Sequence, residues 1–134
     1  LLVVDDNRHA AESMAMLLRM EGYAVHVVYD GPSAVEAVQT LRPRAVLLDL
    51  GLRGLDGFQV AERIRATPEG ARILLIAISG YGQDEHRHRA QKSGFDRHFV
   101  KPIDPAAIMQ LLESEGVSDN RSGTGNVVAF QKNR

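Results

Sequence analysis

Five side chains that can carry charge or donate a hydrogen bond each follow an apolar run of the sequence: Asp5, Asp6, Asp49, Ser79 and Lys101. Three of them are carboxylates, which repel one another when they gather and are relieved by a cation. An oxygen-only ligand set favours a hard ion such as Mg²⁺, or Mn²⁺ in its place. Lys101 and Ser79 offer donors to the oxygens of a phosphoryl group, and Asp49 offers a nucleophile that would form an acyl phosphate. These residue types therefore predict a site for a divalent metal and a phosphoryl group.

The apolar runs are predicted strands, and the segments between them have helical period. The strands are expected at residues 1–4, 24–28, 45–48, 73–78 and 97–100. Helices are expected after the first four strands: one that carries Met14, Leu17 and Leu18 and stops at Gly22, one that follows a turn at Asp30-Gly31 and carries Ala34, Val35 and Val38 to before Pro43, one from near Asp56 to before Pro68, and one over about 83–93. A last helix is opened by Asp104 and Pro105 and turns Ile108, Leu111 and Leu112 inward.

Strands that alternate with helices predict an α/β fold, because each return to a parallel sheet needs a crossover connection that covers one face. The doubly wound, flavodoxin-like order 2-1-3-4-5 suits five strands and places the switch point between the first and third. Ligands in such sheets bind beside the switch point, at the carboxyl ends of the strands. Asp5, Asp6 and Asp49 follow these two strands, so we expect them to share one cleft.

Composition limits the class of protein. The chain has 134 residues, 44% apolar and 25% charged, with a formal net charge of -1, which is ordinary for one globular domain and gives no electrostatic footprint for nucleic acid. It has no cysteine, so neither disulfides nor thiolate metal sites are expected. No apolar run approaches the length of a membrane helix, and we expect a cytoplasmic protein that does not bind a membrane.

The chain begins inside an apolar run, so we expect it to be a piece of a longer one. Residues 1–113 are the expected domain, and the polar residues 114–134 are an expected flexible tail or linker.

The motifs resemble the receiver domain of two-component response regulators over about residues 1–112. They are the Leu-Val-Val-Asp-Asp run at 2–6, Leu-Leu-Asp-Leu at 47–50, Asp-Gly at 56–57, Ile-Ala-Ile-Ser at 76–79 and Val-Lys-Pro at 100–102. The resemblance implies a phosphorylatable signalling domain rather than an enzyme, one that assists its own phosphorylation and dephosphorylation. Asp49 would accept phosphate from a histidine kinase or a histidine phosphotransfer domain.

The resemblance also implies roles for individual residues. Asp6 would contact the metal directly, Asp5 would act mainly through water, and the Gly51 carbonyl would complete the protein ligands. Ser79 and Lys101 would bind the phosphoryl oxygens, and the signal would leave through the fourth helix, fifth strand and fifth helix, toward an output domain or a second copy of the chain. The run at 79–85 resembles receivers attached to hybrid histidine kinases. The Lys101–Pro102 bond would be cis.

Several positions differ from the common family pattern. His98 stands where the family usually has tyrosine or phenylalanine, whose rotamer follows activation, so a pH-sensitive switch and a tolerated substitution both stay open. Arg53 stands where proline is common, and Tyr81 is a candidate shield of the acyl phosphate. The histidines and arginines of 85–89 are expected to form a solvated helix surface, because residues two apart do not share a helical face.

Other functions share parts of this pattern. A flavodoxin-like cofactor binder has the same fold, but Asp5 and Asp6 would repel a phosphate in the absence of metal. A pseudo-receiver would serve only as an interaction module and would not need an intact set of acids with Ser79 and Lys101. A phosphatase would need a second acid soon after Asp49, and Leu50 and Gly51 supply none.

Overall fold

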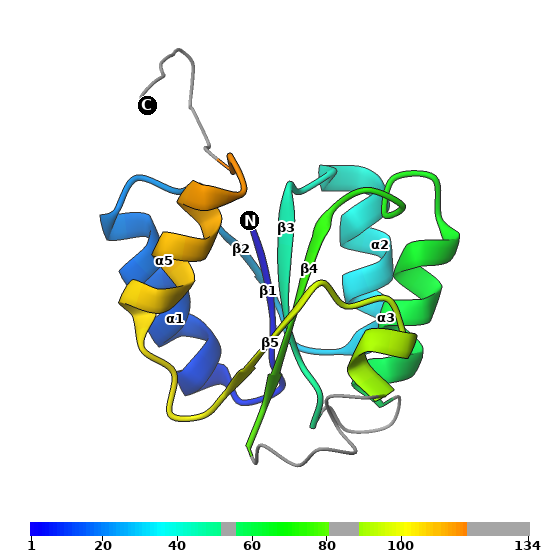
Figure 1. Ribbon diagram of the computed structural model, residues 1–134, viewed down its shortest axis with the longest axis horizontal. Coiled ribbons are helices and arrows are strands. Elements are labelled where there is room, and N and C mark those ends of the chain that lie inside the picture. The colour runs from blue at the N-terminus through cyan, green and yellow to red at the C-terminus, as the bar shows by residue number, and fades with distance from the viewer. Residues whose placement is uncertain (52–55, 81–88, 118–134) are drawn as a thin grey trace.

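A single parallel sheet forms the centre of the computed structural model, which describes residues 1–51, 56–80 and 89–117 (Figure 1). The strands are β1 (Leu2–Val4), β2 (His26–Val28), β3 (Ala45–Asp49), β4 (Leu74–Ser79) and β5 (Arg97–Val100). Their order is β2-β1-β3-β4-β5, and every neighbouring pair is parallel. The predicted fold class and strand order are confirmed.

Helices cover both faces of this sheet (Figure 1). On one side lie α1 (Arg8–Met20) and α5 (Pro105–Ser114), and on the other lie α2 (Gly31–Leu41) and α3 (Gly57–Ala66). Residues 89–92 are also helical and are the described end of the helix expected over 83–93. A side chain directly before each complete helix accepts a hydrogen bond from an amide of its first turn, which explains where these helices begin: Asn7, Asp30, Asp56 and Asp104.

Two apolar cores fill the space between the sheet and its helices. One packs Leu2, Leu48 and Leu75 against α2 and α3, and the other packs Leu47 and Ile76 against α1 and α5. All residues of β3 are buried, as expected for the central strand of a sheet that is covered on both faces. The cores pack against both faces of β1 and β3; Asp5 and Asp6 directly follow β1, and Asp49 is the last residue of β3.

The strand ends differ slightly from the prediction. β2 begins at His26 rather than at residue 24, and β1 and β4 each begin one residue later than predicted, at Leu2 and Leu74. β3 and β4 each end one residue later than predicted, at Asp49 and Ser79. The extension has a simple cause, since Asp49 pairs with Ile78 and the Leu50 amide donates to the Ile78 carbonyl at 2.8 Å. Asp49 and Ser79 are therefore the last residues of rigid strands rather than the first residues of loops.

The helical stripes were predicted well, with one exception. Leu18, Ile108 and Leu112 are buried and Leu111 is partly buried, but Leu17 is 36% exposed. Packing continues past Ser114, because Val117 is 6% exposed and belongs to the core under α1 and α5. The boundary between domain and tail stays a prediction.

Some expectations fall outside the described residues, namely those on Arg53, Tyr81, residues 85–88 and the tail from 118. The Lys101–Pro102 peptide bond is cis, as the resemblance implied. Among the residues that the structure covers, no helix is both long and apolar enough to span a bilayer.

Candidate functional site

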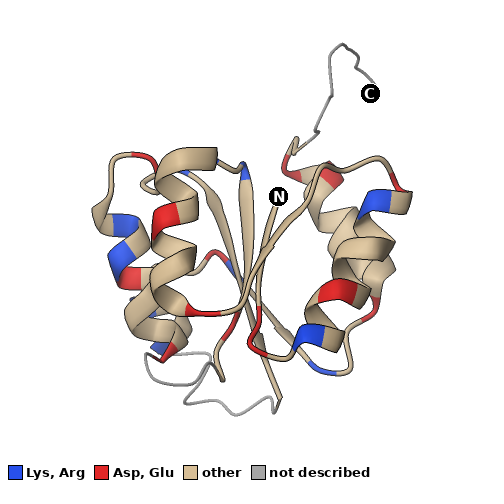
Figure 2. Ribbon diagram, turned by 180° about the vertical axis from the view of Figure 1, so that it is seen from behind, with Lys and Arg blue, Asp and Glu red and all other residues tan. Residues whose placement is uncertain are grey.

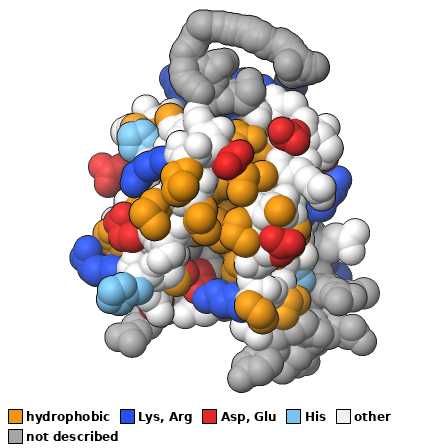
Figure 3. All heavy atoms as spheres, turned by 90° about the vertical axis from the view of Figure 1, so that its left-hand side faces the viewer, with side chains coloured by type: hydrophobic (Ala, Val, Ile, Leu, Met, Phe, Trp, Pro, Cys, Tyr) orange, Lys and Arg blue, Asp and Glu red, His pale blue; other side chains and the backbone are white. Residues whose placement is uncertain are grey.

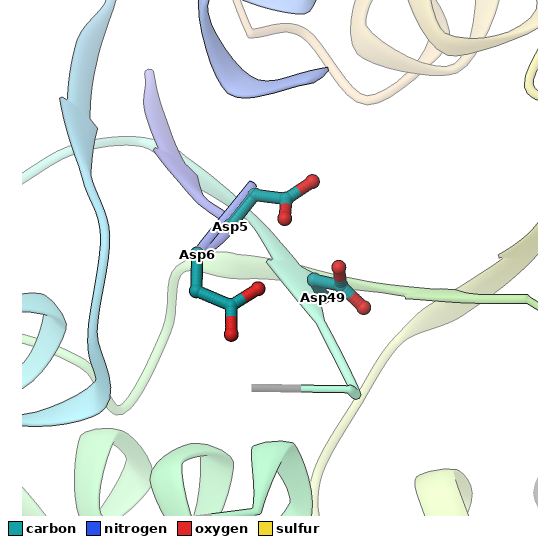
Figure 4. Close-up of side chains that lie close together, drawn as sticks. All are labelled: Asp5, Asp6 and Asp49. Atoms are coloured by element: carbon teal, nitrogen blue, oxygen red, sulfur yellow. The ribbon is translucent and has the colours of Figure 1, made fainter. Parts of the chain in front are cut away.

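The carboxyl ends of β1 and β3 bring three acidic side chains together (Figure 4). One carboxylate oxygen from each of Asp5, Asp6 and Asp49 lies within 4.8 Å of the others. Asp5 and Asp49 are buried and Asp6 is half-buried. Figure 2 shows acidic positions on the loops and strand ends at this edge of the sheet. The predicted cleft therefore contains the three predicted carboxylates.

Asp49 is held by a donor at each of its carboxylate oxygens. The Gly51 amide donates to Oδ1 at 2.9 Å, and Lys101 Nζ donates to Oδ2 at 3.1 Å. The side chain is only 10% exposed, so these contacts replace water that a surface carboxylate would have. They also fix the direction of the carboxylate, which a nucleophile at this position requires.

Lys101 is the cation of the cleft. Its Nζ lies 4.0 Å from Asp5 Oδ2 in addition to its contact with Asp49. Partial burial lowers the pKa of Lys101, but the hydrogen bond and charge of Asp49, with the charges of Asp5 and Asp6, outweigh burial and raise it overall. The ammonium group therefore stays charged at neutral pH.

The surroundings of Asp5 disfavour its charged form. Burial, followed by the charge of Asp49 and a hydrogen bond with it, raises the pKa of Asp5 from 3.8 to about 6. The Asn7 amide, which donates to Asp5 Oδ1 at 2.9 Å, and the Lys101 ammonium oppose this rise and do not cancel it. A second cation beside Asp5 would favour its charged form and lower its pKa.

The donor set fits a hard divalent ion. All three candidate ligands are carboxylates on one small area of surface, which suits Mg²⁺ or Mn²⁺ and suits neither copper nor zinc. Lys101 is a cation that already contacts the cluster, at Asp5 and Asp49. Gly51 is positioned beside Asp49 through its amide, and the role of its carbonyl as a ligand stays a prediction.

Ser79 lies at the same edge of the sheet but makes a different contact. It is 2% exposed, and its Oγ lies 2.8 Å from His98 Nε2. The structure thus joins two residues that the sequence analysis treated separately. The parallel register pairs Ala77 with His98, and this places His98 beside Ser79 on one face of the sheet.

Two further groups of side-chain contacts were not predicted. Arg89 donates to Asp56 at 3.0 Å and stacks on the Phe58 ring, with its guanidinium carbon 4.2 Å from the centroid, and so connects helical residues 89–92 to the start of α3. Arg8 stacks on Tyr29, whose hydroxyl donates to Glu12. Such pairings between distant segments have no local sequence signal.

An apolar groove of about 280 Å³ adjoins Asp49 on the side of α1 and α5. It is lined mainly by hydrophobic side chains, which include Val3, Met14, Leu17, Ile103 and Pro105. Figure 3, which faces this side of the molecule, shows hydrophobic side chains gathered on the surface. The exposed Leu17 is one of the residues that line this groove.

Comparisons with known proteins agree with this geometry. The family model of the response regulator receiver domain matches residues 1–113. An uncharacterised 14.6 kDa protein of Leptolyngbya boryana is 30% identical over 113 residues, which are 84% of this chain and 86% of that protein. The DNA-binding response regulator MtrA of Mycolicibacterium paratuberculosis is 37% identical over 114 residues, which are 85% of this chain and 49% of MtrA. This chain thus spans about half the length of MtrA.

A solved structure gives the same result. The receiver domain of the sensor histidine kinase PA1611 from Pseudomonas aeruginosa, with a magnesium ion coordinated in its active site cleft, has a TM-score of 0.78 and 31% identity. The match covers 84% of this chain and 93% of that receiver domain. From the family match, the sheet order and the acidic cleft together, we conclude that this chain belongs to the response regulator receiver domain family of two-component signal transduction.

Proposed function

We propose that this chain is a phosphoaccepting receiver in which Asp49 takes a phosphoryl group from the phosphohistidine of a histidine kinase or a histidine phosphotransfer domain. The observation that carries the proposal is the state of Asp49. It is a buried carboxylate with both oxygens oriented by donors, and one of the donors is a lysine. A structural aspartate at the end of a strand has no need for two acidic neighbours.

The proposed transfer exchanges one bond to phosphorus for another. A carboxylate oxygen of Asp49 forms the new P–O bond while the P–N bond to the donor imidazole breaks, and the imidazole keeps the electron pair and takes up a proton. Lys101 lies close enough to Asp49 that its ammonium group could donate to the carboxylate before the transfer and to a phosphoryl oxygen after it. Hydrolysis of the acyl phosphate by water would return Asp49, so the domain would reset itself without acting on an external substrate.

Asp5, Asp6 and Asp49 would hold Mg²⁺, or Mn²⁺ in its place. When bound, the ion would neutralise negative charge on the phosphoryl oxygens and the carboxylates. The donor chemistry of the three residues and the magnesium ion of the related PA1611 receiver domain support this assignment.

A protein donor suits the surface around the cleft. The groove beside Asp49 is apolar and borders α1, so a partner that brings a phosphorylated histidine can bury hydrophobic side chains there. We propose that phosphorylation then changes the conformation of the face formed by the region after β4, by β5 and by α5. This face would bind an output domain or a second copy of the chain. Direct nucleic-acid binding is not part of the proposal, and the expected cytoplasmic location stays a prediction.

The alternatives have less support. A flavin phosphate would meet the carboxylates of Asp5 and Asp6 and would be repelled by them in the absence of metal. A pseudo-receiver would not require Lys101 to be held 3.1 Å from Asp49.

The decisive experiment is incubation with acetyl phosphate and Mg²⁺, followed by intact-protein mass spectrometry. We expect one phosphoryl group on the wild-type protein and none on Asp49→Asn, which keeps the shape of the side chain and loses its nucleophilic charge. Asp104→Asn is the matched control, because Asp104 is an exposed helix cap on the α5 side, and it should be labelled like wild type. An unlabelled wild-type protein, or labelling that persists in Asp49→Asn, would contradict the proposal.

A further inference from the structure

Ser79 and His98 form a side-chain hydrogen bond that places a condition on the proposed switch. The Oγ to Nε2 distance is 2.8 Å, and Ser79 is 2% exposed. A hydroxyl has one proton to donate. If His98 Nε2 accepts that proton, Ser79 cannot donate it to a phosphoryl oxygen at the same time. If Nε2 carries a proton, the bond still fixes the direction of Oγ.

The sheet places this bond on the opposite face from Asp49. Asp49 pairs in register with Ile78, whose side chain belongs to the core under α1 and α5. Ser79 is the next residue along β4, so its side chain points to the other face, as that of Ala77 does. His98 is paired with Ala77 and therefore meets Ser79 on that second face. The Ser79 hydroxyl must leave this position before it can serve a phosphoryl group on Asp49.

We propose that His98 is a positioning residue that restrains the Ser79 hydroxyl in the resting form through the Nε2–Oγ hydrogen bond, so that phosphorylation of Asp49 must break this bond. The inference rests on the proposed function, because it assigns a regulatory element to the same site. It depends on the imidazole at this position, since the phenylalanine or tyrosine that the resemblance leads one to expect lacks a ring nitrogen.

Removing the restraint should favour the phosphorylated form. A net hydrogen bond is worth about 1 kcal/mol, which corresponds to about a fivefold change in an equilibrium constant. If the competent orientation of Ser79 is the minor one at rest, its population and the apparent affinity for a phosphoryl analogue rise by that factor. His98→Phe should therefore bind beryllofluoride about fivefold more tightly than wild type in the presence of Mg²⁺.

A double-mutant cycle tests whether His98 acts through Ser79. The affinity for beryllofluoride with Mg²⁺ is measured by titration calorimetry for wild type, His98→Phe, Ser79→Ala and the double variant. We expect the fivefold effect of His98→Phe to disappear in the Ser79→Ala background. His98→Gln, whose amide can still hydrogen bond to Ser79, should bind within about twofold of wild type, as expected from a retained net bond.

Three outcomes would overturn the inference. Equal affinities of wild type and His98→Phe would show that the bond does not restrain Ser79. An undiminished effect of His98→Phe in the Ser79→Ala background would show that His98 acts through packing. A wild-type protein that fails to bind beryllofluoride would refute the proposed function and this inference with it, whereas the first two outcomes leave phosphorylation of Asp49 intact. Thermal unfolding of each variant shows that the compared proteins are folded.

Discussion

Replacing Asp5 with asparagine is expected to stabilise the metal-free protein at neutral pH, although it alters the candidate metal site. The folded chain raises the pKa of Asp5 from 3.8 to about 6, mainly through burial. Each tenfold change in proton affinity corresponds to about 1.4 kcal/mol, so ionised Asp5 opposes folding by on the order of 3 kcal/mol. Asparagine removes this charge, and its carbonyl can still accept the Asn7 amide.

The pH dependence follows from the direction of the shift. Between about pH 4 and pH 6 the folded chain keeps a proton on Asp5 that the unfolded chain has lost. The contribution of Asp5 to the free energy of unfolding therefore falls as the pH rises through this window. The advantage of Asp5→Asn should be about 3 kcal/mol at pH 7.5 and about 1 kcal/mol at pH 4.5, where Asp5 is already largely neutral in the fold.

Urea denaturation with a chelator present, at these two pH values, measures the difference. Asp104→Asn is the matched control, since Asp104 also accepts an amide two residues later but is exposed to solvent. It should change the free energy of unfolding by less than about 0.5 kcal/mol at both pH values. If Asp5→Asn is neutral or destabilising at pH 7.5, or equally stabilising at both pH values, the buried charge of Asp5 does not oppose folding as inferred.

Three further predictions concern the same fold. Mg²⁺ should raise the midpoint of thermal unfolding at pH 7.5 much more than at pH 5, because the proton on Asp5 competes with the ion; equal shifts would contradict this. Lys101→Met should keep or improve the affinity for Mg²⁺, but it should weaken beryllofluoride binding by about tenfold or more, because a charge-assisted hydrogen bond is lost. Titration calorimetry that shows no loss of beryllofluoride affinity would refute the phosphoryl role of Lys101. Gly57→Ala should lower the free energy of unfolding by about 1–3 kcal/mol, because a Cβ at this position would lie 2.7 Å from Leu50 Cα. Gly80→Ala is the control and should not lower it, because the space around Gly80 is open. Chemical denaturation of both variants gives the comparison.

The positions of the acidic residues could be predicted because they depend on a rule of architecture rather than on side-chain detail. Apolar runs separated by helices specify a parallel sheet, and its strands end at one edge. Asp5, Asp6 and Asp49 then meet whatever the rotamers are. The helix starts were also readable, since Asp56 and Asp104 are caps with a local signal.

Side-chain contacts between distant segments could not be predicted in this way. Arg65 donates to the carbonyls of Gly94, Gly70 and Ile73 and pairs with Asp96, which ties α3 to the segments before β4 and β5. The bond between Ser79 and His98 depends likewise on the register of β4 with β5. A register is set by packing across the whole sheet, and a shift of one residue would place His98 on the other face. The length of β2 could not be predicted for the same reason, because it depends on pairing with β1, which covers only three residues.

In the proposed function, the acidic cleft would link stability to ligand binding through one set of charges. Asp5 opposes folding when it is ionised, mainly because it is buried, and in the proposed function its charge would help to hold a divalent ion at the ends of β1 and β3. The two apolar cores that flank these strands supply free energy that offsets the cost of burying this charge. Asp5→Asn should therefore move two measured quantities in opposite directions, with a higher free energy of unfolding and a weaker affinity for Mg²⁺. A variant in which both improved would show that the carboxylates do not share one electrostatic site.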